Sequence, residues 1–125
     1  MIKVLVLGGN GYLGKVFSRK FKKKIKIQNP TRKELNLFSK KQIDKYFKKK
    51  NLSFDFILNL CVYQQTGPHL VKNAKKVKDL NNLLNKNILY LWKKYLIESK
   101  LISLGASCAY SSYSKGFSYT KGKLF

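Results

Sequence analysis

The sequence predicts an α/β fold in which a parallel β-sheet carries helices on both faces. Short apolar runs typical of buried strands alternate along the chain with amphipathic segments of helical periodicity. The first apolar run ends in a cluster of glycines directly before the first amphipathic segment, as in a tight strand-to-helix turn. We therefore expect one doubly wound parallel sheet, and the 125 residues suffice for a single domain, residues 1–125.

The first half of the chain contains three candidate strands and two candidate helices. Residues 3–9 form an apolar run that predicts a buried strand, and residues 24–28 alternate as a second strand does. Between them, residues 11–24 place apolar side chains on one helical face and lysines on the other. Residues 35–38 are a very short candidate third strand. Ser39 is a good N-cap for a helix to residue 50, with Ile43, Tyr46 and Phe47 buried.

The second half repeats the pattern with a longer helix. Residues 54–62 predict another buried strand, and a loop containing Gly67 and Pro68 follows. Residues 76–99 have the apolar spacing of a long helix, and residues 101–105 predict the last strand, the fifth. From residue 106 to 117 the composition is small and polar, which indicates a loop.

The charge is extreme, with 27 Lys and Arg against 5 Asp and Glu and a formal net charge of +22. Such a balance points first to nucleic acid or to an anionic membrane. Only Arg19 and Arg32 are arginine, however, and phosphate recognition draws heavily on the planar arginine fork. The chain is also rich in Asn, Ile, Leu, Tyr and Phe and poor in Ala, as AT-rich codon usage produces. We interpret most of the charge as background composition.

Several classes of protein are disfavoured by the sequence. No apolar run approaches the roughly 20 residues of a membrane span, and the N-terminal apolar stretch is too short for a signal peptide. Cys61 and Cys108 form neither a CxxC motif nor a disulfide framework, which suits a reducing compartment. We therefore expect a cytoplasmic protein with no membrane partner and no metal site.

The glycine cluster carries the most specific chemistry in the sequence. It fits G-x-G-x-x-G counted from Gly9 and lies between the first predicted strand and helix. Glycines let the backbone approach a pyrophosphate, and the following helix N-terminus offers free N–H groups to its phosphates. A ligand-free turn is the alternative. The predicted dinucleotide-binding residues of this turn are Gly8, Gly9, Asn10, Gly11, Tyr12, Leu13 and Gly14.

From these residues onward the chain resembles the extended short-chain dehydrogenase/reductases, the NAD-dependent epimerase/dehydratase group, and within it the GDP-L-fucose synthase branch. The matching segments are the glycine turn, residues 31–37, the 54–62 strand, residues 81–89 with Asn81 and Asn87, residues 104–110 (Leu-Gly-Ala-Ser-Cys-Ala-Tyr) and Tyr119-x-x-x-Lys123. The resemblance implies a Rossmann-like NAD(P)-binding domain, truncated after the fifth strand, without the C-terminal substrate domain. It implies an NAD(P)-dependent oxidoreductase or epimerase acting on a nucleotide sugar.

The cofactor choice depends on the residues after the second strand. NAD-binding members place an acid there for the ribose hydroxyls, whereas this chain offers Arg32 and Lys33 and no Asp. We therefore favour NADP over NAD, with Arg32 as the first candidate for the 2′-phosphate; the alternative is that Arg32 is one more solvated cation. The resemblance adds further cofactor contacts, at Asn36, Leu37, Leu60, Cys61, Val62 and Asn81.

The catalytic pair implied by the resemblance is Tyr119 and Lys123, which are one helical turn apart and so share a helix face. A cation near a tyrosine lowers the pKa of its hydroxyl from about 10 and fits it for proton transfer. Tyr90 and Lys94 have the same spacing. The family's hydroxyl residue is replaced by Ala106, so Ser107 is the substitute, and Cys108 matches an acid/base cysteine of the fucose-synthase branch or is a buried, inert thiol.

Three hypotheses for function remain open at this stage. The first is the cofactor-binding half of a nucleotide-sugar enzyme, whose partners are a dinucleotide and a nucleotide sugar, with a homodimer left open. The second is a non-enzymatic dinucleotide-binding Rossmann module or remnant, which Ala106 favours. The third, and least favoured, is a basic nucleic-acid-binding protein.

Overall fold

The computed structural model describes residues 1–49, 51–65 and 67–104, and within them it contains one four-stranded parallel sheet. The sheet order is β2-β1-β3-β4, with every neighbouring pair parallel. The strands are β1 (Lys3–Leu7), β2 (Lys26–Gln28), β3 (Phe56–Asn59) and β4 (Lys100–Ser103). This arrangement confirms the predicted α/β class and the parallel sheet.

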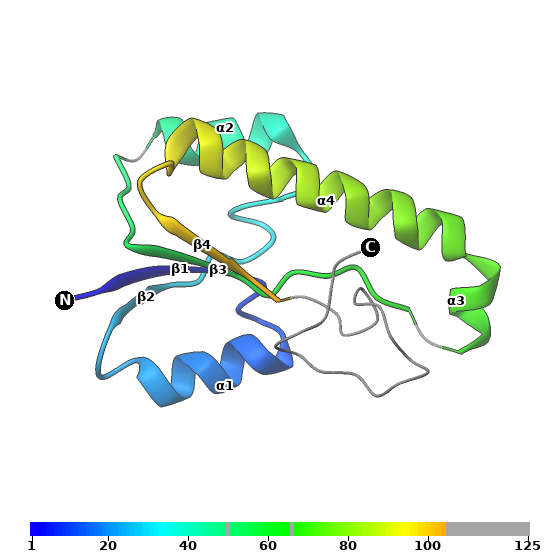
Figure 1. Cartoon of the computed structure of the whole chain (residues 1–125), viewed down its shortest axis with the longest axis horizontal. Helices are drawn as coiled ribbons and strands as arrows, with labels where there is room; N and C mark the ends of the chain where they lie inside the picture. The colour runs from blue at the N-terminus through cyan, green and yellow to red at the C-terminus, as the bar shows by residue number, and fades with distance from the viewer. Residues whose placement is uncertain (50, 66, 105–125) are drawn as a thin grey trace, which may run out of the picture.

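Helices cover both faces of the sheet, as the sequence predicts (Figure 1). The helix α1 (Tyr12–Phe21) lies on one face, and α2 (Lys40–Lys48) and α4 (Ala74–Tyr95) lie together on the other. A short helix α3 (Pro68–Lys72) precedes α4 in the segment that the sequence assigned to a loop. None of the described helices is both long and apolar enough to cross a bilayer.

The predicted third strand, residues 35–38, is wrong: the structure has no strand there, so the sheet has four described strands where five were expected. The backbone turns instead, because the N–H groups of Glu34 and Leu35 both donate to the carbonyl of Thr31. Leu35 and Leu37 are nevertheless buried in the core, which explains the strand-like apolar pattern. The amide of Asn87 on α4 donates to the carbonyl of Leu37 at 2.8 Å, taking the place of a ladder partner.

The main hydrophobic core lies between the sheet and the α2–α4 layer. Leu5, Leu7 and Ile57 contribute the sheet side of this core and are almost completely buried. Ser39 caps α2 by accepting the N–H of Gln42, and Ile43, Tyr46 and Phe47 are buried, as expected. From α4 the buried residues are Leu84, Asn87, Ile88 and Leu91. The parallel pairing of β1 with β3 and of β3 with β4 brings the carboxyl ends of these strands to one edge of the sheet.

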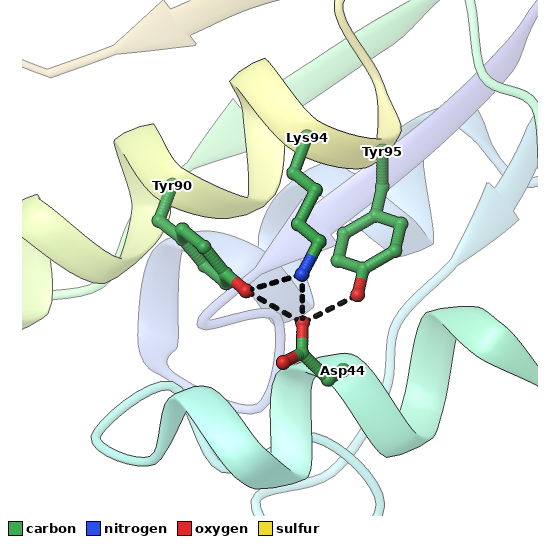
Figure 2. A network of polar contacts seen from close by, with 4 residues as sticks. All are labelled: Asp44, Tyr90, Lys94 and Tyr95. Atoms are coloured by element: carbon green, nitrogen blue, oxygen red, sulfur yellow. Dashed lines mark hydrogen bonds and ion pairs between the residues drawn. The ribbon is translucent and has the colours of Figure 1, made fainter.

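A polar network at the edge of this layer joins α2 to α4 (Figure 2). One carboxylate oxygen of Asp44 accepts hydrogen bonds from the hydroxyls of Tyr90, at 2.8 Å, and Tyr95, and it faces the Lys94 ammonium at 3.3 Å. The Lys94 ammonium also donates to the Tyr90 hydroxyl at 2.7 Å. The Tyr90–Lys94 pair, which has the catalytic spacing, is therefore held within a helix–helix contact.

This network makes the stability of the protein sensitive to acid. The Tyr95 and Tyr90 hydrogen bonds, aided by Lys94, hold the pKa of Asp44 at about 2, below its ordinary value of 3.8. A lowered folded-state pKa stabilises the fold above about pH 4, and this contribution is lost as pH falls toward 2. Asp44→Asn should reduce the stability of the protein at neutral pH. The urea concentration at the unfolding midpoint should also fall less between pH 4 and pH 2 in this variant than in the unaltered chain.

Asp79→Asn is the matched control for this prediction. Asp79 pairs with Lys75 across one turn of α4 in an exposed position, and such pairs contribute little. An Asp79 variant with the same loss of acid sensitivity as Asp44→Asn would contradict the role assigned to the network.

Candidate functional site: a cavity at the carboxyl edge of the sheet

The site is built where β1 and β3 end side by side. Gly8 follows β1 with φ +80°, a conformation that side-chain-bearing residues rarely adopt. A Cβ atom at Gly8 would lie 3.0 Å from the backbone of both Leu60 and Cys61, which follow β3. The chain therefore turns out of β1 in a space that only glycine fits, and the two strand ends form one wall.

The turn then leads into the N-terminus of α1. Gly11 is the N-cap, its N–H donates to the carbonyl of Gly8 at 3.1 Å, and no side chain caps the helix. The first turn of a helix has N–H groups without intrahelical partners and carries the positive end of the helix dipole. It also contains no acidic residue. This end of α1 is thus suited to an anion.

Gly14 brings α1 against the turn. A Cβ atom on Gly14 would overlap the backbone of Gly9, and one on Gly9 would overlap the side chain of Asn29 after β2. The third glycine of the motif therefore serves helix packing, while the earlier ones shape the turn.

A cavity of about 530 Å³ opens at this edge, within the size range of ligand sites. It brings together all the predicted cofactor-binding residues except Asn81. Those lining it are Gly8, Gly9, Asn10, Gly11, Tyr12, Leu13, Gly14, Arg32, Asn36, Leu37, Leu60, Cys61 and Val62. These residues come from three segments that are distant in the sequence.

Arg32 is the only charged side chain among the described residues that line the cavity. Its guanidinium lies 5.3 Å from the centre of the Phe38 ring, and the amide of Asn36 fixes the Phe38 backbone by accepting its N–H at 3.0 Å. The nearest acid in sequence, Glu34, does not line the cavity; its carboxylate accepts the N–H and hydroxyl of Thr31. The described part of the cavity wall therefore carries one positive side chain, Arg32, and no acidic side chain.

Cys61 contributes an apolar surface to the cavity. Burial raises the pKa of its thiol to about 11, so the thiol is protonated at neutral pH. A protonated thiol is a weak nucleophile, and this cysteine is suited to packing against a ligand.

Asn81 does not line the cavity but holds one of its walls. Its side-chain oxygen accepts the N–H of Tyr63, and its amide donates to the carbonyl of the same residue, both at 2.8 Å. A third bond runs from the amide to the Val77 carbonyl within α4. Because Tyr63 lines the cavity, Asn81 positions the segment after β3. The sequence predicted that Asn81 belongs to the site, but it did not show whether Asn81 lines the cavity or supports a residue that does.

Comparison with known proteins fits this geometry. A family model described as "NAD dependent epimerase/dehydratase family" matches residues 4–123. The chain belongs to this family. No curated protein sequence matches the chain.

Three solved structures share the fold. A GDP-D-glycero-L-gluco-heptose synthase from Campylobacter jejuni, crystallised in the presence of NADPH, is 19% identical with a TM-score of 0.72, covering 91% of this chain and 33% of that one. A dTDP-4-dehydrorhamnose reductase from Clostridium acetobutylicum is 14% identical with a TM-score of 0.76, covering 99% and 43%. A GDP-L-fucose synthetase from Naegleria fowleri bound to NADP is 21% identical with a TM-score of 0.68, covering 94% and 34%.

This chain spans only about a third to two fifths of the length of these solved proteins. At such identities the likeness concerns the fold of the shared part. It agrees with the α/β fold and its parallel sheet.

Some lining residues were not predicted from the sequence. They are Leu7, Pro30, Leu35, Phe38, Tyr63, Gln64 and Leu84. Tyr63 and Gln64 directly follow a predicted strand, and that position was the available signal, because ligands of parallel sheets bind beyond the carboxyl ends. Leu84 belongs to a helix whose packing against the site only the tertiary structure reveals.

The predicted catalytic residues Ser107, Cys108, Tyr119 and Lys123 lie outside the described residues, as does Ala106. Their roles remain predictions. The strand that precedes them, β4, pairs with β3 in parallel, so it ends at the same edge of the sheet as the cavity.

The close packing of Gly14 on Gly9 predicts a large effect for a small substitution. Gly14→Ala should lower the free energy of unfolding by about 1–3 kcal/mol, because the backbone of Gly9 cannot yield as a side chain can. Urea unfolding measures the change.

Gly11→Ala is the matched control for Gly14→Ala. A Cβ atom there would lie 3.3 Å from the carbonyl oxygen of Gly8, and Gly11 has an ordinary φ of −72°. The control should cost less than about 1 kcal/mol, the range of an N-cap change. Equal losses in the two variants would refute the packing argument.

Proposed function

We propose that the chain is the cofactor-binding part of an NADP-dependent oxidoreductase or epimerase that acts on a nucleotide sugar. The observation that carries the cofactor choice is the single positive charge, Arg32, in a described cavity wall without acids. NAD-binding domains of this type use a carboxylate for the ribose hydroxyls, and a carboxylate would repel a 2′-phosphate. An arginine fork pairs with that phosphate bidentately.

The residues of the cavity suit a dinucleotide. The four glycines of the turn keep its backbone accessible, and the uncapped N-terminus of α1 offers N–H donors to a pyrophosphate. Leu37, Leu60 and Val62 supply apolar walls. Arg32, held over Phe38, would bind the 2′-phosphate at the adenosine end. When bound, the nicotinamide ring donates or accepts the hydride.

The chain's own acid–base chemistry is assigned to the residues of the family motif. Tyr119 would pass its hydroxyl proton to the sugar oxygen, and Lys123, one turn later, would stabilise the tyrosinate and hold the cofactor ribose. Ser107 would bond the same sugar oxygen in place of the hydroxyl residue lost at Ala106. Cys108 is a second acid/base candidate for an epimerising member.

The named activities of the solved neighbours support the substrate class. They are a GDP-heptose synthase, a dTDP-sugar reductase and a GDP-L-fucose synthetase, so each acts on a sugar carried by a nucleotide. The activity of a whole enzyme is proposed from a chain that spans only part of their length. A second candidate, a non-enzymatic dinucleotide-binding module, is favoured by Ala106 at the family's hydroxyl position.

Arg32→Ala tests the cofactor assignment. The substitution should weaken NADP binding by roughly 10- to 100-fold, the range for a lost charge-assisted bond, and leave NAD binding almost unchanged. Fluorescence titration of the purified chain with both dinucleotides measures this.

Arg19→Ala removes the only other arginine, which is exposed on α1, and should change neither affinity. Absence of binding by NADP and NAD at millimolar concentrations would overturn the cofactor proposal. A preference for NAD in the unaltered chain would overturn the assignment of Arg32.

Tyr119→Phe tests the catalytic assignment. NADPH-dependent reduction of a nucleotide 4-keto sugar should fall by about 10²- to 10⁴-fold, the usual contribution of a general acid, with cofactor affinity unchanged. The matched control is Tyr90→Phe, since Tyr90 has the same spacing to a lysine but donates to Asp44. That control should affect stability and not the rate per folded molecule. Turnover that survives Tyr119→Phe would refute the catalytic role of Tyr119. Absence of turnover with bound NADPH would favour the non-enzymatic candidate.

A further inference from the structure

The edge of the sheet opposite the cavity gathers exposed lysines. Lys22, Lys23 and Lys24 follow α1, Lys26 begins β2 and Lys3 begins β1, and all are exposed. Lys3 and Lys26 are partners in the parallel register, and the N–H of Lys26 donates to the carbonyl of Ile2 at 2.8 Å. These segments therefore lie side by side. We call residues 1–3, 22–24 and 26 the basic edge.

The basic edge has little compensating negative charge. Residues 1–33 contain no Asp or Glu. Asp55 is the acid beside it, and its carboxylate accepts the backbone N–H of Lys3 at 2.7 Å. The ion pairs Lys75–Asp79 and Lys94–Asp44 lie within α4 and between α4 and α2, so they involve none of the lysines of the basic edge. The positive field of the basic edge is thus open to an external anion.

Two apolar side chains are exposed among these lysines. Met1 is 89% and Ile2 49% exposed, and the backbone of Ile2 is bonded directly to that of Lys26. Lysines around exposed apolar side chains match the interface of an anionic bilayer, where cations meet headgroups and apolar groups enter the acyl boundary.

A nucleic acid would contact the lysines of the basic edge but not its exposed apolar side chains. Phosphate contacts engage the cations and leave Met1 and Ile2 exposed. The basic edge also contains no arginine, the residue whose planar fork suits phosphate and base recognition. The apolar pair and the lysine composition therefore favour the bilayer.

We propose that the basic edge docks the protein on the surface of a membrane rich in anionic phospholipid. The amino and carboxyl ends of the strands lie at opposite ends of the sheet (Figure 1). The basic edge lies at the amino ends and the cavity at the carboxyl ends, so docking leaves the cavity open to solution. The sequence argument against a membrane partner rested on the lack of a spanning segment. Surface attachment requires no such segment, and it is independent of the proposed enzymatic function.

The test is co-sedimentation of the full chain with lipid vesicles, without cofactor. Vesicles of phosphatidylcholine with about a third phosphatidylglycerol should bind the chain, and pure phosphatidylcholine should not. Reversing the charge of Lys22, Lys23 and Lys24 to Glu should weaken binding by about a hundredfold or more, since each lysine near the surface contributes about fivefold. Ile2→Ser should weaken binding without altering charge.

The matched control replaces three exposed lysines of α4 with Glu: Lys76, Lys78 and Lys86. It changes the net charge equally and should retain most of the binding. Thermal unfolding of each variant confirms that it is folded, and Ile2→Ser provides an independent measurement should the charge variant be unstable.

Four outcomes would overturn the proposal. Equal losses in the two charge variants would show that net charge alone drives adsorption. If Ile2→Ser and the charge variant of residues 22–24 both bind vesicles as well as the unaltered chain does, the basic edge is not the membrane-binding surface. Loss of duplex DNA or RNA binding in that variant, with vesicle binding unaffected, would assign the surface to nucleic acid. Failure of the unaltered chain to bind the anionic vesicles is the fourth, and NADP binding by the same preparation would leave the proposed function intact.

Discussion

The contact of α1 with the end of β1 is the constraint on which the site depends. Gly14 packs where a Cβ atom would overlap the Gly9 backbone, and Gly8 turns with a positive φ against the segment after β3. These contacts allow the uncapped helix N-terminus to reach the carboxyl edge of the sheet. The cavity of about 530 Å³ opens beside this glycine turn, and its apolar walls come largely from residues that follow the strands ending there.

Charge is abundant in this chain, and its meaning depends on position. Most cations are exposed lysines in water, where a single charge contributes little. Arg32 differs because it lines a cavity without a described acid. Lys94 differs because it joins a carboxylate and two tyrosines between helices (Figure 2). The lysines of the basic edge differ because they surround exposed apolar side chains.

The errors of sequence interpretation have definite causes. Leu35 and Leu37 are as buried as strand residues. Their backbone groups, however, bond to the Thr31 carbonyl in a turn and to the Asn87 amide of α4, and not to a neighbouring strand. Asn81 has a side chain able to bond a ligand, yet it bonds both backbone groups of Tyr63. Local patterns report burial and polarity. They do not report which distant backbone group completes a hydrogen bond.

The sequence by itself determined the fold class, the glycine turn and about two thirds of the described cavity lining, because strand and helix periods and the need for glycine are local properties. The family match over residues 4–123 agrees with that interpretation. Only the tertiary structure decided that Arg32 is the charged residue of the described wall, that Asn81 supports the wall from behind, and that the Tyr90–Lys94 pair joins two helices. Those facts depend on contacts between segments far apart in the chain, which no local pattern encodes.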